Sequence, residues 1–528
     1  MADGYAYTST PSPEELARFD LNDFGNAMRL IRLVGGEVDG EGEIELSAAT
    51  LLYLREIGWI GWNGRHWDQK LGQRLAERTA HKVAQGLIAQ APFLIANGFD
   101  KKLAWSFVRT AGNAGQIASM LKVAESYLQV DLEEFDRDPQ AFTVLNGTLR
   151  FRRESGDGLK VTLDKHDPRH RITRMAQVVY DPDAKAPIWE KKLEFWQPDP
   201  AMRGYLQRLA GYAMTGHTHE QVFVAFQGKG GDGKSTFMNV LRELFGAYGD
   251  VADVRTFLDT GQRGGAEASP DLARLAGDCR LVSVAEPPRG AKLNEAMIKS
   301  FTGGQPIVAR RLRQDLFSFL PKPKVFLEAN SRPVIRGDDE GIWRRIRLVM
   351  WEHSLTKAQM DTTLPDKLRA EYSGILNWIV QGVGDWLAEG LAEPERVRAA
   401  MDDYRKGSSP FGEWLVDCVE LVEGVKTPAK AFFDSYKAWC EDQGIERPMS
   451  QTAFGNALAD RQIIRAGKDS AGRVLRMGAR LRDRSAPLAP LDDVPATSPG
   501  GSSAGGSGGA SAYVGFDPGD YDGLEDGQ

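Results

Sequence analysis

One octapeptide restricts the fold of this chain more than any other feature. Residues 228–235 read Gly-Lys-Gly-Gly-Asp-Gly-Lys-Ser and fit the pattern G-x-x-x-x-G-K-[ST]. An apolar run at 222–226 precedes the octapeptide, and a segment with helical spacing at 234–245 follows it. Glycines allow successive backbone N–H groups to turn toward phosphates, and the helix adds the positive end of its dipole. The context therefore predicts a strand, a phosphate-binding loop and a helix, in this order.

The octapeptide also assigns roles to its residues. We expect Lys234 to contact the phosphates of ATP as a point charge, Ser235 to ligate Mg²⁺ and Thr236 to touch the phosphates. The residues expected to bind the nucleotide are Gly228, Gly230, Gly231, Asp232, Gly233, Lys234, Ser235 and Thr236. A glycine-rich loop that matches by chance is the alternative, and the flanking elements disfavour it.

Two further strands are predicted to complete an NTPase site in a parallel α/β layer. The run at 280–285 leads to Glu286, which we expect to hold Mg²⁺ or to polarise the attacking water. The run at 325–329 leads to Asn330, which we expect to orient that water. In Trp343-Arg-Arg-Ile-Arg347, Arg345 is the candidate for the charge that develops in phosphoryl transfer. The alternatives are a solvated glutamate, a turn asparagine and a basic surface patch.

Length and composition indicate a multidomain protein with ordinary cores. The 528 residues are too many for one core, and 42% are hydrophobic and 26% charged. The formal charge is −7, but residues 485–528 alone contain seven acidic residues and no Lys or Arg. Three distant cysteines argue against a disulfide framework or a zinc ribbon and favour the cytoplasm. We find no signal peptide pattern and no membrane span, so we expect no membrane partner.

The pattern along the chain predicts five segments. Residues 1–45 read as a loosely ordered, flexible arm with one helix, and 46–188 as a mainly helical domain that ends in strands, with a hairpin turn at Asn146-Gly147. Residues 189–405 begin with a helical run over 189–214 and contain the NTPase motifs. Residues 408–484 read as three helices and a short hairpin with a strand at 473–480, which suggests a winged helix. Residues 485–528, rich in Gly, Ser and Asp, cannot bury enough apolar surface to fold.

Positive charge is concentrated in two segments. Residues 299–347 contain eleven Lys or Arg against five acidic residues, and 461–484 contain eight against two. Residues 307–320 read as two strands around a polar tip, a hairpin that could present basic side chains to a nucleic-acid backbone. The candidate DNA contacts are Lys299, Arg310, Arg311 and Arg313. A solvated charged surface could explain either segment alone.

Three other features look functional but are interpreted as structural. They are the tryptophans Trp59, Trp62 and Trp67, the acidic pair Asp181 and Asp183, and the segment 217–220 (His-Thr-His-Glu). We expect the tryptophans to be core rather than a base-stacking platform. Pro182 separates the two aspartates, so we expect a turn rather than a polymerase metal site. The histidines lack further nearby ligands, so we expect no metal there.

With these residues placed, the chain resembles superfamily 3 helicases of the phage and plasmid primase-helicase family, which includes poxvirus primase-helicases. The resemblance covers about residues 50–484. It rests on Trp62-x-x-x-x-Trp67, Phe135-Asp136, residues 145–149 and 211–216, the motif 228–235, Lys299-Ser-Phe-Thr-Gly-Gly304, Asn330, Trp343-Arg-Arg345, residues 436–440 and Ser450-x-x-x-Phe454-Gly455.

The resemblance implies an AAA+-type P-loop ATPase core in a homo-hexameric ring with single-stranded DNA in its channel. Residues 228–236 would be the Walker A motif, Glu286 the Walker B acid, 299–313 the DNA-facing motif and Asn330 sensor one. Arg345 would be the finger that reaches a neighbour's nucleotide. Relatives often carry an N-terminal primase-polymerase domain. Only about 50 residues precede the shared region here, so we do not expect this chain alone to prime.

The most favoured function is therefore an ATP-dependent replicative DNA helicase in phage or plasmid replication. One alternative is a primase-helicase with divergent priming activity, which would depend on Asp181 and Asp183. Another is an origin-binding or loader ATPase that uses the winged helix on duplex DNA without processive unwinding. The acidic tail, 485–528, could recruit a replication partner or shield the basic channel.

Overall fold

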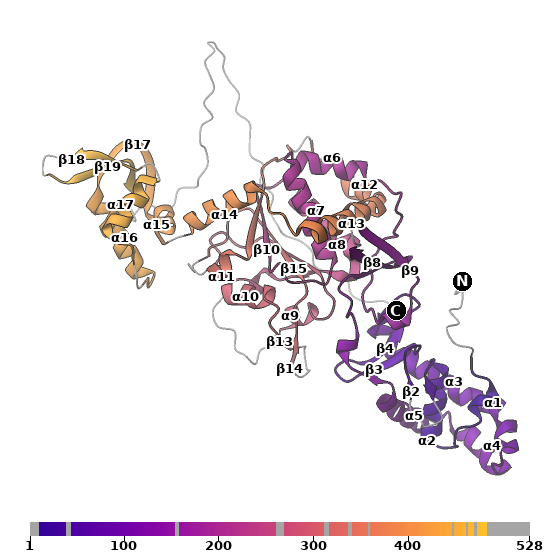
Figure 1. Cartoon of the computed structure of the whole chain (residues 1–528). Helices are drawn as coiled ribbons and strands as arrows, with labels where there is room; N and C mark the ends of the chain where they lie inside the picture. The colour runs from indigo at the N-terminus through magenta and orange to yellow at the C-terminus, as the bar shows by residue number, and fades with distance from the viewer. Residues whose placement is uncertain are drawn as a thin grey trace, which may run out of the picture.

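The computed structural model describes residues 10–38, 44–153, 158–259, 269–310, 316–335, 340–356, 359–408, 410–445, 448–460, 463–468 and 472–482. A mainly helical N-terminal region is followed by a central α/β region and a smaller C-terminal unit (Figure 1). The predicted mixed α/β class with a helical N-terminal region is confirmed at this level. No helix in the described ranges is long and apolar enough to cross a membrane.

The N-terminal region packs four helices beside a small sheet. The helices are α2 (Asp23–Leu33), α3 (Gln69–Ala96), α4 (Lys101–Thr110) and α5 (Ala114–Tyr127), preceded by the short α1 (Pro13–Leu16). The strands are β3 (Leu51–Leu54), β4 (Gly58–Trp62), β5 (Trp67–Asp68) and β6 (Gln129–Val130), in the order β5-β4-β3-β6, and β1 (Glu37–Val38) pairs with β2 (Ile44–Glu45).

The expected flexible arm is a folded part of this region over residues 10–38. Asn22 caps α2 by accepting a hydrogen bond from the Gly25 N–H at 2.7 Å. Ala27, Leu30 and Ile31 of α2 are fully buried in one cluster with residues of α3 and α5. Their i, i+3, i+4 spacing is that of a helix with one apolar face. The helix expected in the arm is therefore present, but it is packed into the core and not loosely ordered.

The three tryptophans belong to the core, as predicted. Trp59, Trp62 and Trp67 are 5%, 9% and 1% exposed, too little for a base to stack on them. The Trp67 Nε1–H donates to the Pro168 carbonyl at 2.9 Å, and its ring meets Phe135 edge to face.

A second sheet belongs to the same core as the central region. Strands β7 (Ala141–Val144), β8 (Gly147–Arg153) and β9 (Leu159–Asp164) are antiparallel, and the predicted hairpin turn lies between β7 and β8. Phe142 stacks on Tyr248 with ring centroids 4.5 Å apart. One hydrophobic cluster therefore extends across the predicted domain boundary at residue 188.

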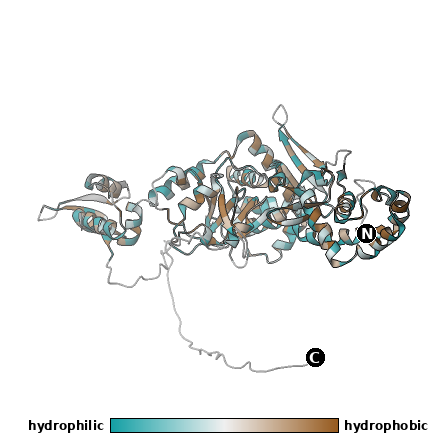
Figure 2. Ribbon diagram, turned by 90° about the horizontal axis from the view of Figure 1, so that it is seen from below, coloured by the Kyte–Doolittle hydropathy of each residue, from teal (hydrophilic) through white to brown (hydrophobic). Residues whose placement is uncertain are grey.

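The central region contains a five-stranded, fully parallel sheet. Its strands are β10 (Phe223–Gly228), β11 (Gly249–Ala252), β12 (Leu281–Val284), β15 (Lys324–Ala329) and β16 (Ile346–Trp351), in the order β11-β12-β15-β10-β16. The strands are almost continuously apolar because helices cover both faces, and hydrophobic colouring is concentrated in the middle of the molecule in Figure 2. β10 and β16 align Phe223 with Ile346 and Gly228 with Trp351, so all five strands have their carboxyl ends at one edge.

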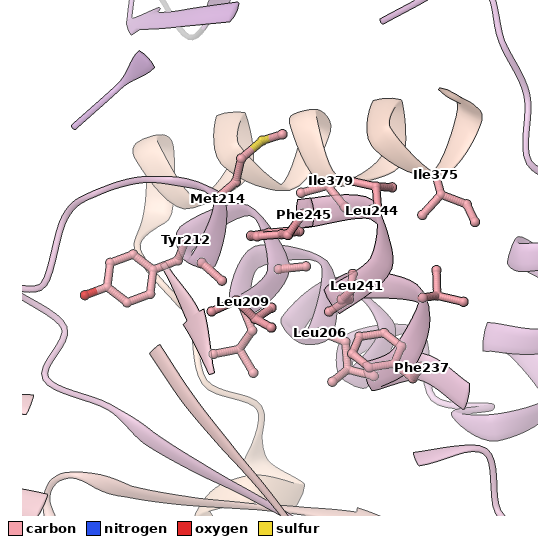
Figure 3. Close-up of a cluster of buried hydrophobic side chains, with 14 of the residues drawn as sticks. Leu206, Leu209, Tyr212, Met214, Phe237, Leu241, Leu244, Phe245, Ile375 and Ile379 are labelled. Carbon is pink, nitrogen blue, oxygen red and sulfur yellow. The ribbon is translucent and has the colours of Figure 1, made fainter. Parts of the chain in front are cut away.

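Helices on one face of this sheet form the largest core. They are α6 (Pro187–Trp196), α7 (Pro200–Met214), α8 (Lys234–Phe245), α12 (Leu364–Ala370) and α13 (Tyr372–Glu389). Figure 3 shows side chains of α7, α8 and α13 meeting in this core. The helices α7 and α13 can approach closely because Gly211 has no side chain. A Cβ there would lie only 2.3 Å from the Gly382 carbonyl carbon. The helix predicted over 189–214 is two helices, since Pro198 interrupts it and Asp199 caps α7.

The remaining elements of the central region connect the sheet strands along the chain. They are α9 (Pro270–Arg274), α10 (Glu295–Thr302), α11 (Glu340–Trp343) and the 3₁₀ turns at Gly246–Tyr248 and Val254–Thr256; two more such turns, Leu132–Glu134 and Pro168–His170, precede the region. The predicted hairpin is present as antiparallel β13 (Ile307–Arg310) and β14 (Leu316–Phe319). Its expected tip, with Arg311 and Arg313, lies outside the described residues.

Helix α14 (Glu395–Gly407) leads to the C-terminal unit (Figure 1). This unit contains α15 (Pro410–Cys418), β17 (Val419–Pro428), α16 (Ala429–Asp442), α17 (Gln451–Asp460), β18 (Ile464–Lys468) and β19 (Val474–Leu481), with the sheet order β17-β19-β18. The three helices and the strand near 473–480 were predicted from the sequence, whereas β17 was not. The predicted disordered tail, 485–528, lies outside the described residues.

Candidate nucleotide-binding site

The glycine-rich loop lies at the carboxyl edge of the sheet, between β10 and α8. Gly230, Gly231 and Gly233 have φ angles of 92°, 66° and 91°, which other residues rarely adopt. Gly233 is also needed for space, because a Cβ there would lie 2.2 Å from Nε1 of Trp196. Later strands of the chain lie on both sides of β10, so the strand order changes direction there. Parallel α/β sheets bind ligands in the crevice at such a point.

Lys234 is held inside the loop by Asp232. Its Nζ lies 2.5 Å from Oδ2 of Asp232, and the two side chains are 5% and 3% exposed. The same carboxylate accepts the backbone N–H groups of Gly230 and Lys234, each at 3.3 Å. Asp232 thus shapes the loop. It also forms an ion pair with the ammonium group of Lys234, which we expect to bind phosphate.

Ser235 meets a carboxylate that the sequence analysis did not single out. Its hydroxyl donates to Oε2 of Glu328 at 2.5 Å. Glu328 lies on β15, where register places it beside Phe226 of β10. The available signal was a single acidic residue inside the apolar strand KVFLEA, two positions before Asn330.

Glu286 and Asn330, which were both predicted site residues, are bonded to each other. Asn330 donates to the Glu286 carboxylate from its backbone N–H at 3.2 Å and from its side-chain amide at 2.7 Å. They come from the ends of adjacent strands, β12 and β15. The pair places an anion and an amide at the mouth of the loop, where both are exposed to solvent.

A cavity of about 680 Å³ connects these groups. Its polar lining comes from residues 230–236, Glu286, Glu328 and Asn330. Its lining also includes the apolar residues Leu355, Met360, Leu364 and Pro365. The segment after β16 is fastened to the loop because the Leu355 N–H donates to the Gly231 carbonyl at 2.8 Å. The cavity therefore suits a ligand that has both an anionic group and an apolar part.

The polar end also suits a magnesium ion. Mg²⁺ prefers oxygen ligands and keeps several waters. The Ser235 hydroxyl, already directed at Glu328, and the exposed Glu286 carboxylate are oxygen donors of this kind. The donor set thus fits the predicted metal and adds Glu328 to the predicted ligands Ser235 and Glu286.

Arg345 lies at the opposite edge of the sheet, just before β16. Its side chain is buried, and its guanidinium donates to the Gly341 carbonyl at 2.5 Å and to Oε1 of Gln221 at 3.1 Å. The preceding Arg344 is exposed. Neither arginine can complete the site of its own chain, because β10 spans six residues and separates the two edges by about 17 Å.

Of the predicted DNA contacts, Lys299 and Arg310 are within the described residues. Lys299 lies in the last turn of α10 and is half-buried. The backbone of Arg310 is fixed at the end of β13, since its N–H donates to the Ser269 hydroxyl and its carbonyl accepts the Ser269 N–H, both at 3.1 Å. The structure brings neither residue into the cavity.

The other two features have structural contacts. Pro182 and Asp183 form the predicted turn, in which the Asp183 N–H donates to Oδ1 of Asp181 at 3.1 Å. His217 and His219 both pack on the Trp386 ring, and the Trp386 indole N–H donates to Glu220 at 2.8 Å.

Comparisons with known proteins match two segments of the chain. Residues 44–198 match the family described as D5 N terminal like, and residues 409–463 match the family described as Poxvirus D5 protein-like. The chain thus contains two D5-type regions of primase-helicase-like proteins, and the predicted resemblance to this family is confirmed. Assignment to superfamily 3 stays a prediction.

Viral proteins described as candidate helicases are among its relatives. The chain is 30% identical over 247 residues to L207/L206 of Acanthamoeba polyphaga mimivirus, a match that covers 44% of this chain and 26% of the relative. It is 29% identical over 177 residues to 022R of Frog virus 3 (isolate Goorha), covering 32% and 18%. It is 25% identical over 371 residues to 184R of Invertebrate iridescent virus 6, covering 68% and 35%. The matched segments span about a fifth to a third of these relatives' lengths.

Among solved structures, the apo C-terminal region of NrS-1 aligns with 64% of this chain and 96% of that chain, at 10% sequence identity and a TM-score of 0.31.

Proposed function

We propose that this chain is an ATP-dependent DNA helicase that works in phage or plasmid replication in the bacterial cytoplasm. One observation carries the proposal: a glycine loop, Lys234, the Ser235–Glu328 pair and the Glu286–Asn330 pair converge at one edge of a parallel sheet. These are the groups that positioning and charge stabilisation of a triphosphate require. The helicase descriptions of the relatives favour DNA unwinding as the work that hydrolysis drives.

In the proposed reaction, the loop N–H groups and Lys234 bind the β- and γ-phosphates of ATP. Lys234 must exchange Asp232 for phosphate oxygens, so binding begins with the opening of one buried ion pair. Ser235, Glu328 and Glu286 would hold Mg²⁺, which would supply positive charge against the negative charge that develops on the phosphates. Asn330 must release Glu286, after which the amide orients the attacking water and the carboxylate polarises it.

The core is proposed to be of the AAA+ type and to act in a ring, for which a hexamer is expected. A guanidinium from the segment 343–345 would reach the nucleotide of the neighbouring subunit. The sequence favours Arg345, while the exposure of Arg344 makes it a second candidate. The hairpin of β13 and β14, with Lys299, Arg310, Arg311 and Arg313, would contact single-stranded DNA, and the C-terminal unit would act as a winged helix on duplex DNA.

The test is a strand-displacement assay on a forked DNA duplex, with the size of the protein measured in ATP. We expect ATP-dependent unwinding by a ring-sized assembly and loss of both turnover and unwinding in Lys234→Ala. ATP hydrolysis without unwinding would contradict the helicase assignment and support a loader ATPase. Primer synthesis that is lost on changing Asp181 and Asp183 would instead support a primase-helicase.

A further inference from the structure

A third basic segment lies outside the central region, in helices α3 and α4. Residues 69–112 contain seven Lys or Arg against two acidic residues. The basic residues are Lys70, Arg74, Arg78, Lys82, Lys101, Lys102 and Arg109. Figure 1 places α4 at the outer end of the N-terminal region, far from β10, the strand that leads into the nucleotide loop. This charge is therefore separate from the hairpin and from the C-terminal unit.

Helix α4 presents a tryptophan between cations on one exposed face. A helix turns about 100° per residue, so Lys101, Trp105 and Arg109, at four-residue spacing, follow one another within an arc of about 80°. Lys102 lies at the border of this arc. All four side chains are exposed, and Trp105 is 39% exposed. Ala104 is the one residue of α4 that is fully buried, so the helix rests on the region by the side of Ala104, about 100° around the helix from Trp105.

The cations on this face have no partners in the described part of the chain. No hydrogen bond or ion pair engages the side chains of Lys101, Lys102 or Arg109 there. The helix itself contains no acidic residue, and Asp100 just before it is used as the cap, accepting the Leu103 N–H at 2.9 Å. An exposed tryptophan among unneutralised cations leaves both apolar surface and positive charge available to a ligand.

The spacing matches single-stranded nucleic acid. With a rise of 1.5 Å per residue, Lys101 and Arg109 each lie about 6 Å from Trp105 along the helix axis. An unpaired base can stack on the indole while the neighbouring phosphates meet the cations on either side. A base inside a duplex cannot offer its face to the indole. An acidic protein would satisfy the charges but would not depend on stacking.

We propose that the face of α4 formed by Lys101, Lys102, Trp105 and Arg109 binds single-stranded DNA outside the nucleotide-driven region. Trp105 stacks on one base, and the three cations contact the flanking phosphates. The contact requires no nucleotide, so its test is independent of the proposed ATPase. It gives the N-terminal region a function of its own, which is to hold the strand that enters or leaves the central region.

The experiment measures the affinity of the full-length chain for a fluorescent oligothymidylate by anisotropy, without nucleotide. All variants are made in an Arg310→Ala background, so that the hairpin contributes less to binding. We expect Trp105→Ala to weaken binding about 10-fold, which is the effect of losing one stacked base, and Trp105→Tyr to restore most of it. Lys101→Ala and Arg109→Ala should each lower the slope of log affinity against log salt by about 0.7.

Two control variants are available in the same region. Leu103→Ala removes an apolar side chain that is 57% exposed on the other side of α4, and Lys122→Ala removes a cation that is already paired with Glu125. Both should bind like the parent. Equal affinity of Trp105→Ala and the parent, or an equal loss in Leu103→Ala, would overturn the proposal. An effect of Trp105→Ala that persists on an abasic oligonucleotide would also overturn it, because no base is then present to stack. ATP hydrolysis without DNA should be the same in all variants.

Discussion

Glu328 is a residue of the candidate site that the sequence analysis did not predict. Its carboxylate accepts the Ser235 hydroxyl, so it orients a predicted magnesium ligand and carries charge beside it. Glu328→Gln keeps the size and the hydrogen bond but removes the charge. We expect it to reduce magnesium affinity and turnover about 10- to 100-fold, the range found when groups that support metal ligands are changed. The measurement is turnover against Mg²⁺ concentration, with magnesium-free nucleotide binding as the control. An unchanged magnesium dependence would show that Glu328 only fixes Ser235.

Arg344 and Arg345 should differ when each is changed to alanine. Arg345 is buried, and its loss leaves Gln221 and the Gly341 carbonyl without their partner, which should cost about 1–3 kcal/mol of stability. Arg344 is exposed, so Arg344→Ala should unfold at the parent's temperature. Thermal unfolding and ATP turnover of the assembled protein separate the roles. A stable Arg345→Ala variant that binds ATP but does not hydrolyse it would identify Arg345 as the finger, and normal turnover in both variants would exclude this segment.

The residues of the candidate site could be predicted from the sequence only where a local motif requires a particular residue type at each position. The glycine loop was identified because each position has a separate physical requirement, and Glu286 and Asn330 were identified because each follows an apolar strand. Glu328 was missed because its importance depends on strand register. Only the parallel pairing of β15 with β10 brings it to Ser235. The burial of Arg345 depends equally on a distant residue, Gln221, which no local pattern could supply.

Helix α14 connects the nucleotide site to the C-terminal unit. The Arg332 guanidinium, two residues after Asn330, donates to Gln227 at 3.0 Å and to Asp403 of α14 at 2.7 Å. The Tyr404 hydroxyl, also on α14, donates to the Pro333 carbonyl. We therefore expect a movement of the Asn330 loop to displace the helix that leads into α15.

Asp403→Asn should weaken this connection while leaving the fold intact. The Asp403 side chain of the Arg332–Asp403 ion pair is largely exposed to solvent, so the pair contributes little to the stability of the fold. We expect the stimulation of ATP hydrolysis by DNA to fall severalfold while hydrolysis without DNA stays unchanged. Glu395→Gln, which removes a similar exposed ion pair on the same helix, is the matched control. If both variants keep full stimulation, α14 does not couple the two parts.

Elements with a strict period were predictable, and elements that depend on their neighbours were not. The predicted helix at 234–245 matches the observed bounds of α8. Strand β17 was missed because it pairs along one side with β19, more than 40 residues later in the chain. The arm was expected to hold one helix, but the packing of α2 into the core was not predicted, because only the distant helices α3 and α5 bury its three apolar positions.

At the scale of the whole molecule, buried charges join the N-terminal and central regions. Lys322 donates to the Asp136 carbonyl at 2.8 Å and to Asp278 at 3.2 Å, and Asp278 also pairs with Arg280. Burial and then the charge of Asp278 raise the pKa of the Asp136 carboxyl to about 6. Burial also opposes ionisation of Asp278, but Arg280 and Lys322 outweigh it and hold its pKa below the ordinary value.

The raised pKa of Asp136 predicts a pH dependence of stability. An unfolded aspartate has a pKa of about 3.9, so between pH 7 and pH 5 the folded chain takes up a proton here that the unfolded chain does not. This group therefore adds stability as the pH falls through 6. Relative to Asp136→Asn, the parent should gain in unfolding temperature between pH 7.5 and pH 5. If the difference in unfolding temperature between the parent and Asp136→Asn is the same at pH 7.5 and pH 5, the raised pKa of Asp136 is refuted.

The proposed shared site can be tested by mixing two inactive proteins. The loop and the arginines lie at opposite edges of one sheet, so the proposed site, in which an arginine acts on the bound nucleotide, needs two chains. Lys234→Ala has a defective loop but intact arginines, whereas the arginine variant that loses turnover has an intact loop. If the two are mixed at equal amounts as separated subunits and then assembled with ATP, about a quarter of the interfaces in a random ring combine the two intact halves. Turnover should therefore return to about a quarter of the parent's rate, although each variant alone has none. No recovery in mixed assemblies, shown to contain both variants, would mean that the guanidinium and the phosphate loop do not act on the same nucleotide.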